Sequence, residues 1–413
     1  MNDFLILLVL FAAISIGWFL GRRSSSPSST GSELTSDYYK GLNYLLDGRP
    51  DGAIDSFIDA LEVNSETLDT HLALGNLLRK RGEVERAIRV HQNLLARPSL
   101  PRVQIHQAHL ELAKDYISAG LLDRAESLLL SLVDESAEQR EQSRRYLLEI
   151  YQSEREWHRA IEVAGDLLAR KKLLGVAASG TNDEGSRQLI IARAHYYCEL
   201  AEVKLSAGDL RGAHGLLEKA LGQDKQCVRA SIMLGQVEYK SGHFKRAIKA
   251  LRKVRHQAPD FLPETISLLR KCYGEIGDEK SLRVYLEDCL GSDPSPNLLL
   301  AVAEDICEGG GKKAAAEFLS SRLADQPSLR GLARLIRLQL DITEGPARDN
   351  LDMLQVLVTQ LLAERPLYRC EHCGFAGQQL HWFCLSCKYW GAMKTIKSGG
   401  SPRTSVSPNV ELE

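Results

Sequence analysis

The chain has 413 residues, of which 44% are hydrophobic and 26% are charged, and its formal net charge at pH 7 is −2. This length is enough for two or three domains with a sizeable buried core. The nearly balanced charge excludes a general electrostatic attraction to nucleic acid or to an acidic surface. We therefore expect no nucleic-acid partner, and any other partner must be recognised locally.

The N-terminal segment is strongly apolar. Phe4–Leu20 contains seventeen residues without a charge, which as a helix would be about 26 Å long and would approach the thickness of a bilayer's hydrocarbon core. A cleaved signal peptide is disfavoured because Asp3 precedes the apolar run and no Ala-x-Ala site follows it. We predict a transmembrane anchor over residues 1–21. Arg22 and Arg23 follow it, so the positive-inside rule leaves the N-terminus outside and the bulk of the chain in the cytoplasm.

Two further segments have the composition of flexible chain. Residues 22–36 include Ser24–Ser32, which carries no aliphatic or aromatic side chain, and we predict a linker there. Residues 397–413 are rich in serine and proline, and we predict a disordered tail.

From about residue 37 the sequence repeats with a period near 34. Gly41 and Gly75 lie at this interval, and so do Ala53 and Ala87. The same interval recurs later in the chain at Ala213, Ala247, Ser281 and Ala315. This period is typical of tetratricopeptide repeats, in which each pair of amphipathic helices buries its apolar stripe by stacking on its neighbours.

One unit, residues 72–95, shows the expected pattern in detail. Gly75 permits close packing of the first helix, and Gly82 ends it. The first helix is predicted to bury Leu74, Leu77 and Leu78, and the second Ala87, Ile88 and Leu94.

Glycine turns mark the other units. They are predicted at Asp47-Gly48, Arg81-Gly82, Ala119-Gly120, Ala207-Gly208, Ser241-Gly242, Ile276-Gly277 and Gly309 to Gly311. Two insertions lengthen the period. Arg97–Arg102 is one, and Lys171–Arg187 is the other, which we interpret as a long mobile loop and a tolerated insertion.

The most specific motif lies near the C-terminal end. Cys370, Cys373, Cys384 and Cys387 form a C-x2-C-x10-C-x2-C array, which can enclose one metal ion in four sulfurs and so describes a structural site. Disulfides or chance are the disfavoured alternatives. Zn²⁺ is favoured because it accepts tetrahedral sulfur without redox chemistry, but iron also fits such a cage, as in rubredoxin. The other cysteines occur singly and are interpreted as buried residues in a reducing cytosol: Cys198, Cys227, Cys272, Cys289 and Cys307.

The residues around these cysteines indicate a small module that also packs against the repeats. His372 and His381 lie beside the motif, but four cysteines already complete a tetrahedron, so we expect them outside the ligand set. Aromatic residues are dense here, and a module of this size has little other core. Some are expected over the metal loops and others against the repeats: Phe375, Trp382, Phe383, Tyr389 and Trp390.

The sequence contains no complete catalytic motif of the types considered below. The Gly309–Lys313 stretch superficially resembles a phosphate-binding loop, but Ile306 occupies the position of the first glycine and Lys313 that of the serine or threonine. Neither a His-Glu-x-x-His pair nor a Gly-x-Ser-x-Gly elbow occurs. We therefore predict a binding protein and not an enzyme.

The predicted fold is all-α with a small metal ribbon. A right-handed superhelical tetratricopeptide-repeat solenoid spans residues 37–327, and a pair of capping helices occupies residues 328–364. An N-terminal transmembrane helix precedes the solenoid, and a four-cysteine, rubredoxin-like zinc ribbon follows it over residues 365–396. The sequence does not determine the oligomeric state, and a homo-oligomer is compatible with it.

Several segments, taken in order, resemble one family over nearly the whole chain, the lipopolysaccharide assembly protein B family of Gram-negative bacteria. They are Gly21-Arg-Arg-Ser, Leu74-Gly-Asn-Leu, Arg81-Gly-Glu-Val-Glu-Arg-Ala-Ile, Tyr196-Tyr-Cys-Glu-Leu-Ala, Tyr368-Arg-Cys-x-x-Cys-Gly-Phe and Trp382-x-Cys-x-x-Cys. The resemblance places the family's metal ligands at the four clustered cysteines. The insertion at 171–187 and the tail depart from the family pattern, so partner contacts near them are not carried over.

The resemblance implies a regulator of lipopolysaccharide and lipid A biosynthesis at the bacterial inner membrane, with a periplasmic N-terminus. Such an adaptor promotes proteolysis of the deacetylase of the committed step by a membrane AAA+ metalloprotease. It is controlled by a lipopolysaccharide-sensing inner-membrane regulator. One alternative is a general membrane-tethered repeat chaperone or assembly scaffold for envelope proteins, which would use the same groove on varied clients. A second alternative is a nucleic-acid-binding ribbon, which the local positive charge of residues such as Arg365, Arg369 and Lys388 supports weakly.

Overall fold

The computed structural model describes most of the chain after residue 67. The described residues are 68–96, 100–173, 184–292, 295–363 and 365–396, with the backbone alone at 170–173 and seven scattered positions between 40 and 56. The predicted anchor, the linker and the tail lie outside them, and so does Gly48. Within the described part of the chain, no helix combines the length and apolar character that crossing a membrane requires.

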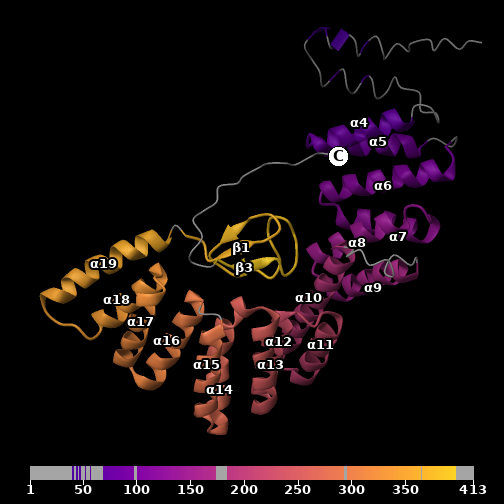
Figure 1. Ribbon diagram of the computed structural model, residues 1–413. Helices are drawn as coiled ribbons and strands as arrows, with labels where there is room; N and C mark the ends of the chain where they lie inside the picture. Colours follow the sequence, from indigo (N-terminus) through magenta and orange to yellow (C-terminus); the bar gives the residue numbers. More distant parts are fainter. Residues whose placement is uncertain are drawn as a thin grey trace, which may run out of the picture. The chain divides into compact units, whose positions relative to one another are not determined.

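The chain divides into two compact units, residues 1–140 and 141–413. In the first unit, the described residues after 67 form two helical pairs (Figure 1): α4 (Leu68–Lys80), α5 (Val84–Leu95), α6 (Arg102–Ser118) and α7 (Leu122–Glu135). Each helix packs on the next along the chain, and α4 also contacts α6. The first helices of successive pairs therefore line up beside each other, as stacked repeats require.

The second unit continues the pairs and ends in a small sheet (Figure 1). Its helices are α8 (Arg140–Ser153), α9 (Trp157–Leu173), α10 (Glu184–Ser206), α11 (Leu210–Gln223), α12 (Val228–Lys240), α13 (Phe244–Gln257), η1 (Pro259–Phe261), α14 (Pro263–Ile276), α15 (Glu279–Ser292), α16 (Pro296–Gly310), α17 (Lys312–Asp325), α18 (Leu329–Leu340) and α19 (Pro346–Ala363). Even-numbered helices are the first of their pairs. The second helices α11, α13, α15 and α17 begin 34, 35 and 33 residues apart, as the repeat period predicts.

Most turns within pairs share one hydrogen-bond pattern, which the turns after α16 and α18 lack. Gly82 has φ 83° and its N–H donates to Arg79, while the next N–H, of Glu83, donates to Leu78 at 2.9 Å. This pattern is a Schellman motif, which needs a left-handed residue that glycine supplies at little cost. The predicted glycines at 120, 208, 242 and 277 also have positive φ.

One turn of this type carries no glycine, and the sequence pattern missed it. Arg155 has φ 59°, and the N–H of Glu156 donates to Tyr151 at 2.9 Å, which completes the same motif between α8 and α9. Conversely, Gly309 and Gly310 belong to helix α16, and Gly311 alone connects it to α17.

Three further expectations are wrong in detail. Leu77 is exposed because it lies on the outer side of α4, while Leu78 is buried. Ser281 is exposed, and the equivalent of Ala247 is the buried Leu282, because this period is 35 residues and not 34. The predicted loop at 171–187 is partly helical, since α9 extends to Leu173 and α10 begins at Glu184.

The core of the second unit lies between stacked helices. Small residues are fully buried in three of the second helices: Ala213 in α11, Ala247 in α13 and Ala315 in α17. Larger side chains from α13 to α16 form one continuous cluster with Ala247, including Leu251, Leu269 and Leu286. Of the five single cysteines, 198, 227, 272 and 289 are buried as predicted, whereas Cys307 is only half-buried.

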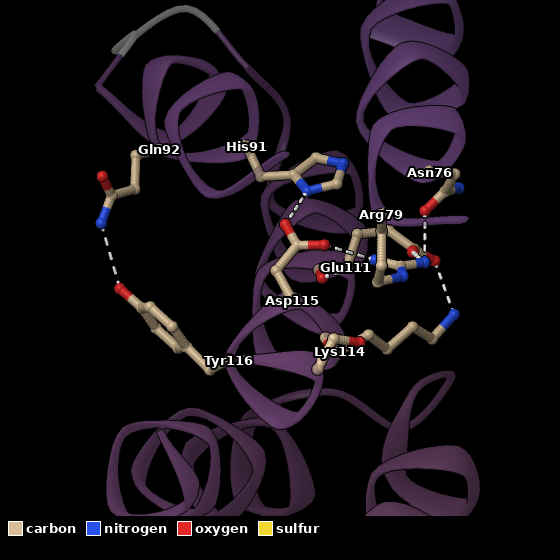
Figure 2. A network of polar contacts seen from close by, with 9 residues as sticks. Asn76, Arg79, His91, Gln92, Glu111, Lys114, Asp115 and Tyr116 are labelled. Carbon is tan, nitrogen blue, oxygen red and sulfur yellow. Dashed lines mark hydrogen bonds and ion pairs between the residues drawn. The ribbon is translucent and has the colours of Figure 1, made fainter. Parts of the chain in front are cut away.

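In the first unit a buried polar network joins α4, α5 and α6 (Figure 2). Asp115 has no exposure, and its carboxylate accepts from Nδ1 of His91 at 2.5 Å and from Arg79 at 2.6 Å. Arg79 also donates to Glu111 at 2.8 Å. Gly75 is required here because a Cβ would lie 2.4 Å from the His91 ring. The network therefore fixes the registry of three helices through charged groups that have few alternative partners.

Glu111 extends this network by accepting hydrogen bonds from Arg79 and Lys114. Burial opposes ionisation of its carboxyl, but hydrogen bonds from Lys114 and Arg79 hold its pKa below the usual value. The carboxylate therefore stays charged at neutral pH and keeps both cations in place.

The C-terminal residues form a three-stranded antiparallel sheet. Its strands are β1 (Tyr368–Cys370), β2 (Ala376–Gly377) and β3 (Met393–Thr395), in the order β2-β1-β3. Cys370 pairs with Met393 across β1 and β3. We call residues 365–396 the ribbon from here on. It lies beside helices of the second unit (Figure 1).

Candidate metal centre

Two tight turns of the ribbon, here called knuckles, present the four predicted cysteines. In the first, the N–H of Gly374 donates to the carbonyl of Cys370 at 3.0 Å, and the N–H of Cys370 donates to Phe375 at 2.7 Å. In the second, Lys388 donates to Cys384 and Cys384 to Tyr389, both at 2.9 Å. The knuckles thus share one backbone pattern, in which the residue after the second cysteine is left-handed.

This left-handed position is filled differently in the two knuckles. Gly374 has φ 77°, which costs glycine little, whereas Lys388 has φ 58°, which is strained for a side chain with a Cβ. The second knuckle therefore carries backbone strain that metal binding and the surrounding contacts must offset.

The geometry of the four sulfurs fits one tetrahedral ion. All four Sγ atoms lie within 4.8 Å of one another. Cys370 and Cys387 are 3.7 Å apart at Sγ, and so are Cys373 and Cys384. An ion with metal–sulfur bonds of about 2.3 Å has sulfur–sulfur edges of about 3.8 Å, whereas a disulfide is about 2.05 Å long. The donor set therefore fits Zn²⁺ or iron and is not arranged as two disulfides.

The electrostatics of the knuckles favour the thiolate at one cysteine. The backbone N–H of Phe375 donates to the sulfur of Cys373 and lowers its pKa to about 6. Burial raises the pKa of Cys387 to about 12, although the N–H of Tyr389 opposes it. Burial also raises the pKa of Cys370. A metal ion must therefore displace protons from the buried thiols, so metal affinity rises with pH.

Aromatic side chains hold the ribbon against helices α8, α9 and α10. Trp390 is almost fully buried, and its indole Nε1 donates to the Gln152 side chain of α8 at 3.0 Å. Its ring stacks on His195 of α10, with ring centroids 5.1 Å apart, and contacts the ring of Tyr196 edge-on, with centroids 5.8 Å apart. The ring of Trp157 of α9 also contacts Trp390 edge-on, with ring centroids 6.1 Å apart. One ribbon side chain thus contacts three helices.

Trp382 makes a second anchor farther along the solenoid. Its ring stacks on Phe261 of η1 at 5.2 Å, and Leu380 packs beside it on the same buried cluster. Lys394 also lies over the Phe261 ring, with its ammonium 5.6 Å from the ring centroid. Arg330 of α18 donates to the carbonyl of Pro366 at the base of the ribbon. The ribbon therefore bridges repeats that are far apart in sequence.

Gly391 of the ribbon lies directly against His195 of α10. A Cβ at Gly391 would lie 3.2 Å from Nε2 of His195 and 3.5 Å from Ile191, and Gly391 also has φ 66°. Burial, together with a smaller effect of nearby Arg229, lowers the pKa of His195 to about 3. The imidazole is therefore neutral at physiological pH and serves as an apolar ring between two tryptophans.

A pocket of about 250 Å³ remains beside Trp382 on the first helices α10 and α12. Its wall includes Met233 and Arg229. Arg229 is buried and forms ion pairs of 2.6 Å with Glu199 and Glu202. The pocket thus combines apolar side chains with a fixed charge network.

The structure brings all four predicted cysteines together and leaves His372 and His381 outside the cluster. His372 instead stacks on Tyr389, with ring centroids 3.6 Å apart. Sequence reasoning expected aromatic residues between ribbon and repeats but did not identify the receptor residues Trp157 and His195. The only available signal was the presence of a large aromatic side chain at Trp157 in a chain with 6% aromatic residues.

The fold and the site together define a tetratricopeptide-repeat protein with a C-terminal, rubredoxin-like metal-binding domain. Comparison with known families agrees. The model of the rubredoxin metal binding domain matches residues 368–395, and models of the tetratricopeptide repeat match residues 70–101 and 204–272.

Curated relatives cover almost the whole chain. Lipopolysaccharide assembly protein B of Escherichia coli K12 is 35% identical over 396 residues, which are 95% of this chain and 98% of the relative. The protein of the same name from Haemophilus influenzae is 33% identical over 405 residues, with the same coverage of both chains. The chain belongs to the lipopolysaccharide assembly protein B family.

Proposed function

We propose that this protein is an inner-membrane adaptor that regulates lipopolysaccharide biosynthesis by promoting proteolysis. In this proposal it brings the deacetylase that commits precursor to lipid A to a membrane AAA+ metalloprotease. A lipopolysaccharide-sensing inner-membrane protein controls the delivery. The observation that carries the proposal is the family membership, because relatives named for lipopolysaccharide assembly align over 95% of the chain.

The repeat fold supports a role in binding other proteins. Stacked helical pairs offer extended surfaces, and such surfaces in repeat proteins recognise polypeptides. The pocket beside Trp382, with Met233 and the Arg229 ion pairs, is the part of that surface next to the ribbon. We propose that the client contacts this region, and that the protein itself catalyses no reaction.

The apolar N-terminal segment supports action at the membrane. We propose that residues 1–21 anchor the chain once, with the N-terminus in the periplasm and the remainder in the cytoplasm. Such tethering confines adaptor and protease to one surface and raises their effective concentration without a new contact. Deletion of residues 1–21 should therefore weaken delivery even though the repeats remain folded.

We propose Zn²⁺ as the resident ion. Zinc supplies no redox chemistry in a four-sulfur site, and its role would be to hold the two knuckles in the conformation that presents Trp382 and Trp390 to the repeats. Metal analysis of the full chain purified without added metal tests this point. A stoichiometric iron content with the visible absorbance of an iron tetrathiolate would contradict it.

The decisive test is the lifetime of the deacetylase in cells. Its half-life should lengthen when this protein is removed and return to normal when the full chain is restored. The lifetimes of several unrelated envelope proteins serve as controls. A general loss of envelope proteins with an unchanged deacetylase half-life would instead favour the chaperone alternative.

A further inference from the structure

The last described helix of the solenoid, α19, exposes an apolar surface. Among the described residues of this helix, Val358 alone is buried. Five large apolar side chains of the same helix are between 45% and 61% exposed: Met353, Leu354, Val356, Leu357 and Leu361. Scattered apolar residues are common on protein surfaces, but a cluster on one helix indicates an interaction site.

Four of these residues form a continuous stripe. Met353, Leu354, Leu357 and Leu361 follow the spacing i, i+1, i+4 and i+8, which places them along one side of an α-helix. The side chain of Val358, which packs inward, lies next to this stripe on the helix surface. Residues 353–363 contain no charged residue. We call Met353, Leu354, Leu357 and Leu361 the α19 stripe.

The stripe lies on the last helix before the ribbon, at the end of the stacked pairs. Inside the unit, α17 buries Ala315, Ala316 and Leu319 in a cluster that includes Leu338 of the following helix α18. After α19 the chain does not form another pair but enters the ribbon, whose Gln378 donates to the carbonyl of Ala363 at the helix end. Terminal repeats of solenoids usually carry a polar outer face. Among the described residues, no further helical pair follows α19 to cover the stripe.

We propose that a second copy of this chain covers the stripe, with the two α19 helices antiparallel about a two-fold axis. An isologous contact brings each surface against itself, so identical charges would repel across it. The uncharged segment 353–363 avoids that penalty, and antiparallel helix dipoles attract. A lipid surface would instead favour several basic residues beside the stripe, whereas Arg348 is accompanied by Asp349 and Asp352 on the same helix.

The proposal fixes which residues meet. Leu357 lies midway between Met353 and Leu361 in sequence, so the two-fold axis passes near Leu357. Each Leu357 then faces Leu357 of the second copy, and each Met353 faces Leu361 of the second copy. This geometry does not depend on the adaptor function, so the two proposals can fail independently.

The first experiment measures the dimer of the full chain in detergent by sedimentation equilibrium. The wild-type protein should associate with increasing concentration, and Leu357→Asp should raise the dimer dissociation constant at least tenfold. Thr359→Asp is the matched control, because it adds the same charge at an exposed position on the opposite side of α19. It should dimerise like the wild type, and both variants should retain the wild-type helical circular dichroism.

A wild-type protein that stays monomeric at every concentration would overturn the proposal, and so would equal dimerisation of both variants. Loss of vesicle binding by Leu357→Asp without any dimer in the wild type would assign the stripe to lipid instead.

Crosslinking tests the orientation. Leu357→Cys should crosslink to itself under mild oxidation, while Met353→Cys should crosslink efficiently only when mixed with Leu361→Cys. Efficient self-crosslinking of Leu361→Cys, with none at position 357, would exclude the antiparallel arrangement.

Discussion

Replacing Trp390 with alanine should release the ribbon from the repeats while leaving both parts folded. The indole contacts His195, Tyr196 and Trp157 on the helices and donates a hydrogen bond to Gln152. Inside the ribbon its ring contacts Phe383, with centroids 4.9 Å apart. The substitution therefore mainly removes interactions that join the ribbon to the solenoid.

The size of the effect follows from burial and from the ring contacts. Removal of a buried tryptophan costs about 3–5 kcal/mol, and an aromatic pair contributes about 0.5–1.5 kcal/mol beyond its buried area. The ring contacts with Trp157, His195 and Tyr196 all cross to the helices. We therefore expect the free energy of ribbon docking on the repeats to weaken by about 3 kcal/mol. This corresponds to a more than 100-fold larger population of the undocked state.

Hydrogen exchange of the full chain measures this opening directly. Peptides from α10 that include His195 should exchange faster in Trp390→Ala, with metal content unchanged. Leu385→Ala is the control, because Leu385 is an exposed leucine of the same ribbon. Gln152→Ala should produce a smaller effect of about 1–3 kcal/mol by leaving the indole N–H unpaired. If α10 exchanges at the wild-type rate in Trp390→Ala while the ribbon keeps its metal, the tryptophan does not hold the two parts together.

Four other predictions concern metal, charge, pH and backbone. Replacing Cys370 and Cys373 together with serine should abolish stoichiometric metal binding, measured by elemental analysis; full metal content would show that the ligands are wrong. Asp115→Asn should destabilise the first unit by about 1.5–3 kcal/mol because half-buried Arg79 keeps only one of its two carboxylate partners, Glu111, and hydrogen exchange of α4 to α6 would report it. The pKa of His195 is lowered by burial to about 3 from 6.5, so its contribution to stability is complete above pH 6.5 and is lost as pH falls. The loss is about 1.4 kcal/mol at pH 5.5, and His195→Phe should flatten the pH dependence of ribbon release. Arg155→Gly should raise the unfolding free energy by about 1 kcal/mol, since glycine adopts positive φ at less cost; a lower thermal stability would contradict this.

Features encoded within a few residues could be predicted from the sequence. Each C-x2-C pair forms its own knuckle through hydrogen bonds that span four or five residues, so the spacing alone defines the metal ligands. The glycine turns are equally local, since a left-handed residue and two backbone hydrogen bonds complete each one. Arg155 was missed for the same reason, because the backbone there adopts the motif without the glycine that signals it.

Features that depend on distant residues could not be predicted. The bond between Trp390 and Gln152 joins positions 238 residues apart, and no periodicity specifies which repeat receives the ribbon. The shift from Ser281 to Leu282 has a related cause. A period that varies between 33 and 35 residues moves the buried position along the sequence, and only packing against the neighbouring helices fixes it.

Metal binding and ribbon docking are linked, because the same residues serve both. The ribbon has about thirty residues, too few for a stable apolar core of its own, and its buried Met393 packs on Cys370 and Cys384. Trp382 and Trp390 flank the second knuckle in sequence, so the conformation set by Cys384 and Cys387 positions both anchors. Docking must then stabilise the metal-bound ribbon, and metal must strengthen docking by the same free energy. A chelator should therefore expose the α10 surface as Trp390→Ala does, and it should remove metal more slowly from the wild type than from that variant.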